Sequence, residues 1–222
     1  MPVFKCPACG LCCTFSPVSL LPHEDVVLKL IAGKLGLPYK SQPGYMVYDE
    51  ISGVNIAFSY VMELVNGKCV FLNGVKCLIH DVYKPLICRS YPYIPRYVKY
   101  NIDEREKRVF AVAEYGLSLA CPVIRRDRGV LEMHVEQPGI LLKYMPREYY
   151  ASIEMENTRN LLLGLLSKLW RDGLVEISTA RRSTQVVNLY EFLRVYYPNL
   201  PNILNIDKVV EKVRVLEGEA GE

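Results

Sequence analysis

Apolar residues recur at helical spacing in four parts of this 222-residue chain. Residues 22–35 begin with a proline, carry acidic residues in the first turn and end at Gly36, so we predict a helix there. The same spacing predicts helices over residues 146–173, 184–197 and 205–217. The first of these three has a wide apolar stripe, formed by Leu161, Leu162, Leu165, Leu166, Leu169 and Trp170.

Residues 45–79 have a different pattern, which is rich in β-branched and aromatic residues and interrupted by turn sequences. The turn sequences are Ser52-Gly53, Asn66-Gly67 and Asn73-Gly74. Because Asn-Gly between apolar residues is a strong hairpin signal, we predict two or three short strands here. Two more strand-like runs, residues 97–102 and 108–115, flank a charged turn. The three prolines within residues 84–95 predict a turn or the start of a short helix.

These elements together predict an α+β fold, in which a small cysteine-rich domain with short antiparallel strands precedes a helical C-terminal region. The composition changes at the Gln-Pro-Gly sequence of residues 137–139, and no cysteine follows Cys121. We therefore expect a metal-binding domain over residues 1–138 and a helical extension over residues 139–222. The apolar stripes of the extension are more typical of a core than of a partner surface, but a protein partner for these helices stays an open alternative.

Charge and hydropathy restrict the classes of partner. The chain has 27 basic and 24 acidic residues, a balance that does not indicate nucleic acid or a membrane surface. The basic run at residues 125–128 is typical of a solvated face, so we expect no nucleic-acid partner. No apolar run approaches the roughly 18 to 20 residues that a membrane-spanning helix needs. No signal-peptide pattern begins the chain, so we expect a cytoplasmic protein without a membrane partner.

The chain contains eight cysteines, four of them in the sequence CPACGLCC near its start. Two cysteines separated by two residues can turn both sulfurs toward one ion, which is why this spacing recurs in zinc and iron–sulfur sites. In a reducing cytosol such a cluster indicates metal binding rather than disulfides. Scarce Gln beside abundant Tyr, Val, Ile, Lys, Arg and Glu is compatible with a thermophile, whose intracellular proteins can contain disulfides. A disulfide-stapled domain therefore stays an alternative.

Three cysteines at C-x-x-C-x-x-C spacing, Cys6, Cys9 and Cys12, together with a remote cysteine before proline follow the ligand pattern of ferredoxin-type clusters. Cys121-Pro122 offers such a remote cysteine, although the additional cysteine of ferredoxins is missing. Adjacent Cys12 and Cys13 should point in different directions, which favours two sites, or one site with a spare thiol. We prefer Cys6, Cys9 and Cys12 with a remote cysteine in one site and Cys13, Cys69, Cys77 and another cysteine in the second.

These residues resemble the CxxCxxCC cysteine-cluster family (YkgJ-type) of zinc- or iron-chelating domains. The resemblance covers residues 4–124 and is carried by five segments, namely Cys6-x-x-Cys9-Gly10-x-Cys12-Cys13, Gly67-x-Cys69-Val70-Phe71-Leu72, Cys77-x-Ile79, Lys84-Pro85-x-x-Cys88-Arg89-x-Tyr91-Pro92 and Cys121-Pro122. It implies metal chelation without an established reaction. The chain departs from the family pattern at His80, where an aromatic residue is usual, and at Lys84, where arginine is usual. A related arrangement in flagellin lysine-N-methylase links some relatives to protein modification.

All eight cysteines, Cys88 included, are thus candidate metal ligands. Arg89 is a candidate cofactor-binding residue, because a guanidinium can donate hydrogen bonds to a cluster sulfide or a thiolate, and its alternative is a surface salt bridge. We expect an iron–sulfur cluster, of the 4Fe-4S type, that serves electron transfer or supports a modification enzyme. A structural zinc ion in a protein-interaction module is the alternative. Common catalytic motifs are missing, so whether the chain is an enzyme stays open.

Overall fold

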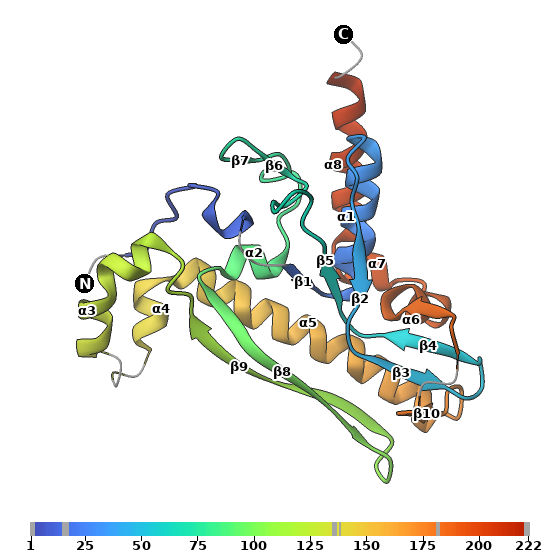
Figure 1. Ribbon diagram of the computed structural model, residues 1–222. Coiled ribbons are helices and arrows are strands. Elements are labelled where there is room, and N and C mark those ends of the chain that lie inside the picture. Colours follow the sequence, from blue (N-terminus) through green and yellow to red (C-terminus); the bar gives the residue numbers. More distant parts are fainter. Residues whose placement is uncertain (1–2, 15–17, 135–136, 138, 181–182, 220–222) are drawn as a thin grey trace.

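The computed structural model describes residues 3–14, 18–134, 137, 139–180 and 183–219 (Figure 1). The described part leaves out residues 1, 2 and 15, which lie on either side of the CPACGLCC sequence. It also leaves out Pro138, at the expected domain boundary. The helices within it are η1 (Leu11–Cys13, a 3-10 turn), α1 (Pro22–Lys34), α2 (Leu86–Ser90), α3 (Pro122–His134), α4 (Ile140–Tyr144), α5 (Pro146–Arg171), α6 (Leu189–Tyr196), α7 (Leu200–Ile203) and α8 (Ile206–Glu219). None of the described helices is long and apolar enough to cross a membrane.

The described strands form small sheets, and most of their pairings are antiparallel. The strands are β1 (Val18–Leu20), β2 (Ser41–Pro43), β3 (Met46–Asp49), β4 (Val54–Ala57), β5 (Tyr60–Met62), β6 (Leu72–Asn73), β7 (Lys76–Cys77), β8 (Tyr93–Asp103), β9 (Arg108–Leu117), β10 (Ile177–Ser178) and β11 (Val186–Asn188). Their spatial orders are β1-β5-β2, β10-β3-β4-β11, β6-β7 and β8-β9. The strand β11 pairs parallel with β4 and is the exception.

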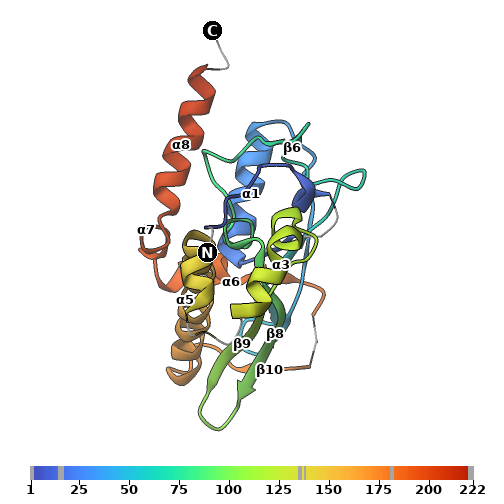
Figure 2. The same ribbon diagram turned by 90° about the vertical axis from the view of Figure 1, so that its left-hand side faces the viewer.

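The long helix α5 lies along the β8-β9 hairpin, and α1 lies beside α8 (Figure 1). The view in Figure 2 shows α8 extending away from the other elements toward its C-terminal end. Trp170 of α5 packs in one core with Ile56 of β4, Ile31 of α1 and Leu193 of α6, and each of these side chains is almost completely buried. This core therefore joins early and late parts of the chain.

The α+β fold predicted from the sequence is confirmed, with short antiparallel strands in the first half and helices in the second. The helices α1, α5 and α8 lie where apolar spacing predicts them, and the Ser52-Gly53 and Asn73-Gly74 turns join paired strands. The division at residue 138 stays a prediction, although strands from both sides of it share the sheet β10-β3-β4-β11.

The helix predicted over residues 184–197 is wrong in its first part, because this segment begins as β11 and becomes helical only at Leu189. The edge of β4 supplies backbone hydrogen-bonding groups to which residues 186–188 pair, and this long-range pairing prevails over local helical spacing. The helix α3 was not predicted from the sequence. Its buried face consists of Val123, Ile124, Asp127 and Leu131, and its exposed arginines obscure the periodicity.

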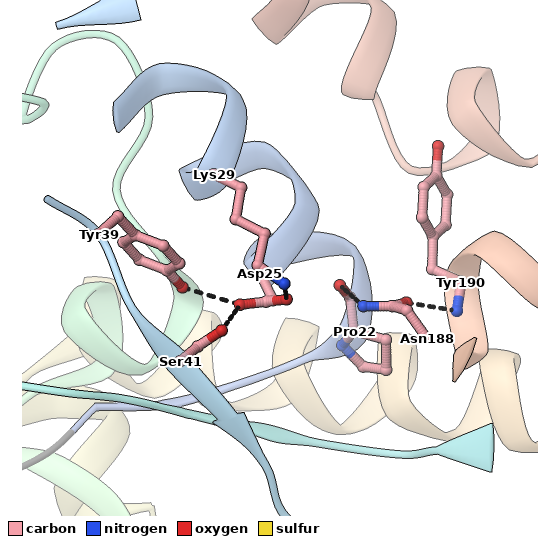
Figure 3. Close-up of polar contacts among 7 residues, drawn as sticks. All are labelled: Pro22, Asp25, Lys29, Tyr39, Ser41, Asn188 and Tyr190. Carbon is pink, nitrogen blue, oxygen red and sulfur yellow. Dashed lines mark hydrogen bonds and ion pairs between the residues drawn. The ribbon is translucent and has the colours of Figure 1, made fainter. Parts of the chain in front are cut away.

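A buried asparagine connects the start of α1 with the start of α6. The Asn188 side chain donates from Nδ2 to the Pro22 carbonyl oxygen at 3.0 Å, and its Oδ1 accepts from the Tyr190 amide at 2.9 Å (Figure 3). Asn188 is thereby the N-cap of α6 while it satisfies a carbonyl from a segment 166 residues away. Both bonds are buried, so losing them leaves polar groups without partners.

We predict that Asn188→Ala lowers the free energy of unfolding by about 2 kcal/mol, because it removes a helix cap and leaves the Pro22 carbonyl unpaired. Asn199 is the matched control, since it occupies the N-cap position of α7 without a side-chain cap bond and is exposed. Asn199→Ala should change stability by less than about 0.5 kcal/mol. Urea unfolding of the variants measures both effects. Equal losses of unfolding free energy in Asn188→Ala and Asn199→Ala would show that the side-chain hydrogen bonds of Asn188 make no specific contribution to stability.

Two neighbouring buried groups give opposite pH dependences of stability. Burial lowers the pKa of His23 to about 4 and raises the pKa of Glu24 to about 7. Between pH 4 and 6.5 the unfolded state binds more protons at His23, so this residue reduces stability as the pH falls. Between pH 4.5 and 7 the folded state binds more protons at Glu24, so this residue reduces stability as the pH rises. The two slopes oppose one another where the windows overlap.

We therefore predict that the wild type loses up to roughly 3 kcal/mol of unfolding free energy through His23 when the pH falls from 6.5 to 4. His23→Gln should not show this loss. Glu24→Gln should remove the opposite slope between pH 4.5 and 7. Chemical denaturation of the wild type and both variants across pH 4 to 7 measures the slopes. Parallel profiles for all three proteins would contradict this assignment.

Candidate metal centre

The N-terminal cysteine segment is a loop shaped by two residues with positive φ. Ala8 has φ of 50° and Gly10 has φ of 71°, and the 3-10 turn η1 follows directly. Gly10 also lies close to the turn between β6 and β7, since a Cβ atom there would be 3.3 Å from the Val75 carbonyl oxygen. A side chain at position 10 would thus meet both backbone strain and a close contact. Glycine lets the loop approach the segment that carries Cys77.

Backbone hydrogen bonds attach this loop at both ends. The Phe4 amide donates to the Tyr144 carbonyl at 2.7 Å, and the Phe4 ring is buried beside the ring of Tyr144. At the other end, the Cys69 amide donates to the Cys13 carbonyl at 2.7 Å. The loop therefore spans from the α3–α4 end of the molecule to the β6-β7 hairpin, and its cysteines lie between the two attachments.

The cysteines form two groups according to which thiols interact. The first thiol group consists of Cys12, Cys13, Cys69, Cys77 and Cys88, all half-buried, and the second thiol group consists of Cys6, Cys9 and Cys121. Cys6 and Cys9 are exposed, whereas Cys121 is buried at the start of α3. All eight are free thiols. Both groups join the N-terminal loop to residues that lie far from it in the sequence.

Within the first thiol group, Cys13 is at the centre. Its hydrogen bond with Cys12 favours a lower pKa, but its contact with Cys69 and burial raise the Cys13 pKa to about 11. The pKa of Cys69 is lowered, chiefly by its hydrogen bond with Cys13 and against the effect of burial. Burial raises the pKa of Cys88, and the nearby Cys13 thiol adds to this effect. These thiols therefore lie close enough to change one another's pKa.

The Sγ atoms of Cys12 and Cys13 are 3.9 Å apart. The expectation that these adjacent side chains point in different directions is therefore wrong, because their sulfurs are in contact. Two sulfurs bound to one tetrahedral ion at about 2.3 Å each lie about 3.8 Å apart. The observed separation fits an edge of such a tetrahedron.

In the second thiol group, burial raises the pKa of Cys121, and the thiols of Cys6 and Cys9 add to this shift. Cys12 lies between the two groups. Burial raises the pKa of Tyr91, and Cys121, Cys12 and Cys9 all contribute to the increase. Cys12 is thus close to members of both groups, whereas the preferred division of the cysteines assigns it to the site with Cys6 and Cys9. That division itself stays a prediction.

No three ligand-type side chains of the described residues are arranged so that they could hold a metal ion as they stand. The donor set nevertheless fits a soft or borderline metal, since it consists of thiols from separate segments gathered on both sides of an irregular loop. Binding would then need rotations of side chains and small movements of the loop. Such closure on a metal couples binding to folding.

Lys84 is a residue whose place near the thiols the sequence analysis did not foresee. Its charge favours lower pKa values at Cys12, Cys77 and Cys88. A cation there favours the thiolate form, which is the form that binds metals. The sequence indicated this place of Lys84 only by its position in the segment that contains Cys88. The family usually has arginine, which is also a cation, at this position.

Arg89 and His80 lie near the cysteines in sequence, but their side chains are exposed. The guanidinium of Arg89 donates two hydrogen bonds to Glu154 of α5, at 3.1 and 2.8 Å. This pair is the surface salt bridge that was the alternative to a cofactor-binding role of Arg89. A hydrogen bond from Arg89 to a cluster stays a prediction.

A buried carboxylate holds α2, the helix that carries Cys88. Glu24 Oε1 accepts from the Leu86 amide at 2.6 Å, and Glu24 Oε2 accepts from the Leu21 amide at 2.9 Å. Leu86 begins α2, two positions before Cys88. Glu24 therefore fixes the backbone of a candidate ligand relative to β1 and α1. Sequence analysis identified Glu24 only as an acidic residue in the first turn of a helix.

A comparison with models of protein families found a match. The family model described as "CxxCxxCC: Putative zinc- or iron-chelating domain" matches residues 5–115, a range that includes seven of the eight cysteines. Cys121 lies beyond the matched range. A search of curated proteins found no match, and a search of solved structures found none either. Since the matched residues make up half of the chain, the protein belongs to the CxxCxxCC family of zinc- or iron-chelating domains.

Proposed function

We propose that this metal-binding protein holds a single zinc or ferrous ion through thiolates of the first thiol group. The observation that carries the proposal is the 3.9 Å separation of the Cys12 and Cys13 sulfurs, which fits two ligands of one tetrahedral ion. Cys69 interacts directly with Cys13, and Cys77 and Cys88 lie close enough to change the pKa values of these thiols. Four thiolates can thus come from three separate segments.

The chemistry of such an ion is structural. A site closed by four protein ligands leaves no position for a substrate, and a metal bound in this way contributes folding energy. The residues that this chain supplies are the thiols, Lys84 to favour their deprotonation, and Glu24 to hold the helix that carries Cys88. The ion would cross-link the N-terminal loop, the β6-β7 hairpin and α2.

The second candidate is a 4Fe-4S cluster bound by Cys6, Cys9 and Cys12 together with Cys121. The effect of Cys6 and Cys9 on the pKa of Cys121 supports it, because this effect places the remote cysteine beside the N-terminal loop. Such a cluster would supply one-electron redox chemistry for electron transfer or for a partner enzyme. It requires Cys12 to turn from Cys13 toward the second thiol group.

We predict that protein purified without oxygen contains one zinc or iron per chain and no acid-labile sulfide. Cys69→Ser should weaken metal binding by more than about tenfold, because serine is a poor ligand for these metals. Cys6→Ser is the matched control, since it removes an exposed thiol of the second group and should leave this ion bound. Elemental analysis and competition with a chelator measure both effects.

Four irons with four sulfides per chain, lost in Cys6→Ser, would favour the cluster and contradict the single-ion proposal. Metal-free protein with intermolecular or intramolecular disulfides would contradict both. Cobalt substitution adds a second measurement, because tetrahedral thiolate coordination gives intense charge-transfer absorption. Absence of that absorption in cobalt-loaded wild type would also contradict the proposal.

We further predict that removal of the metal by a chelator loosens a limited part of the fold. Amide hydrogen exchange should become faster in residues 5–14 and 69–77, because regular pairing there is confined to the short β6-β7 hairpin and the ion would supply their remaining cross-links. Exchange in α5 should change little, since its buried face belongs to the main core. Equal acceleration throughout the chain would show that the ion stabilises the whole fold and not this region.

A further inference from the structure

A cavity of about 360 Å³ lies where β1, α2, α5 and β8 meet. These four elements come together near the middle of Figure 1. None of the eight cysteines lines this cavity, although Ile87, the neighbour of Cys88, does. It is therefore a feature separate from both thiol groups. Its volume is in the range of small-molecule sites in proteins.

Most of the cavity wall is apolar or aromatic. The apolar lining residues are Leu20, Leu21, Ile87, Pro95, Val98 and Met155. Tyr45 and Tyr100 line another side, with their rings stacked 4.8 Å apart at an angle of 20°. Flat rings and aliphatic side chains favour a planar apolar occupant. This composition disfavours a small, strongly hydrated ion as the preferred ligand.

One lining residue, Arg159 of α5, carries a buried charge. It is only 6% exposed, and its Nη1 donates to Oε1 of Glu156. Its Nε is buried and has no hydrogen-bond partner among the described residues. A guanidinium has five N–H donors, and although Glu156, Tyr100 and Tyr115 engage this group, its Nε is left unpaired. Since an unpaired buried charged donor is costly, an acceptor that entered the cavity would be bound favourably.

Charged groups of both signs surround the cavity. Arg96 also lines the cavity, and its exposed side chain donates to the Leu117 carbonyl. Glu156 is the direct counter-charge of Arg159, and it also accepts a hydrogen bond from Tyr115. Glu24 does not line the cavity, but it lies near enough to Arg159 for the Arg159 charge to favour a lower Glu24 pKa, and it is engaged by two backbone amides. The feature that favours a negatively charged ligand is therefore the unpaired Nε of the buried Arg159 guanidinium.

We propose that this cavity binds a small organic carboxylate with a flat apolar body, whose carboxylate pairs with the guanidinium of Arg159. The apolar body lies against Tyr100 and the aliphatic side chains of the wall. The hydroxyl groups of Ser19 and Ser59, which also line the cavity, offer donors to the carboxylate. This binding site goes beyond metal chelation and does not depend on which metal the thiols hold.

The test is a titration of the metal-loaded full chain with phenylacetate, followed by NMR chemical shifts and by calorimetry. We expect a dissociation constant on the order of 1 mM, as for other ligands of this size. Phenylacetamide, which has the same shape without the charge, should bind at least about tenfold more weakly, because it loses the charge-assisted pairing. Inorganic phosphate should bind more weakly still.

Arg159→Gln should weaken phenylacetate binding by about tenfold or more and leave phenylacetamide binding nearly unchanged. Arg105→Gln is the matched control, because it makes the same change of charge at a residue whose side chain is 93% exposed in the β8–β9 turn. It should bind phenylacetate as the wild type does. Metal content is measured in parallel, so that loss of metal is distinguished from loss of the carboxylate site.

If Arg159→Gln does not fold, Val98→Phe tests the same site by filling the cavity from β8, and it should abolish binding of both phenylacetate and phenylacetamide. The proposal is overturned if wild type shows no binding of phenylacetate at about 10 mM. It is also overturned if phenylacetamide or phosphate binds as tightly as phenylacetate does, or if Val98→Phe retains full affinity. These results can occur whether or not the thiols bind metal.

Discussion

Two buried carboxylates in the first turn of α1 fix the arrangement on which both sites depend. A buried carboxylate is costly unless its oxygens accept hydrogen bonds, so its partners are held firmly in place. Glu24 accepts from the backbone of Leu21 and of Leu86 and so joins α1 to α2. Asp25 accepts from Tyr39 at 2.9 Å and from Ser41, and pairs with Lys29 at 2.7 Å (Figure 3). One helical turn thus positions α2 and the start of β2.

The two sides of the candidate metal centre differ in how firmly they are held. On one side, α2 is attached before Cys88 by the Leu86–Glu24 bond and after it by the Arg89–Glu154 pair, although the latter is exposed and contributes little energy. On the other side, the loop that carries CPACGLCC buries the Phe4 ring and little else, and Cys6 and Cys9 are exposed. Polar contacts therefore hold the backbone around Cys88 in place. The CPACGLCC loop, in contrast, would be held in place by a metal bound to its cysteines.

The sequence predicted those parts of the fold that depend on neighbouring residues. The acidic start and apolar spacing of α1 are local, and so are the Gly-containing turns between short strands. The pairing of β11 with β4 joins residues 186–188 to residues 55–57, and no local pattern contains this information. The eight cysteines could be identified as candidates from their spacing. Their interactions could not, because Cys69 meets Cys13 only through the docking of the loop against the β6-β7 hairpin.

The cavity lies beside the first thiol group, because Ile87 lines the cavity and Cys88 follows it on the five-residue helix α2. This proximity does not by itself couple them. A ligand could influence the metal only by moving α2, and the Leu86–Glu24 bond resists that movement at the residue before Ile87. The more direct path is electrostatic, since Glu24 also lies near Arg159 and near Cys88. A carboxylate that neutralises part of the Arg159 charge would favour protonation of Glu24 and thereby change the field at Cys88. Any coupling between the two sites should therefore depend on Glu24 more than on a displacement of the helix.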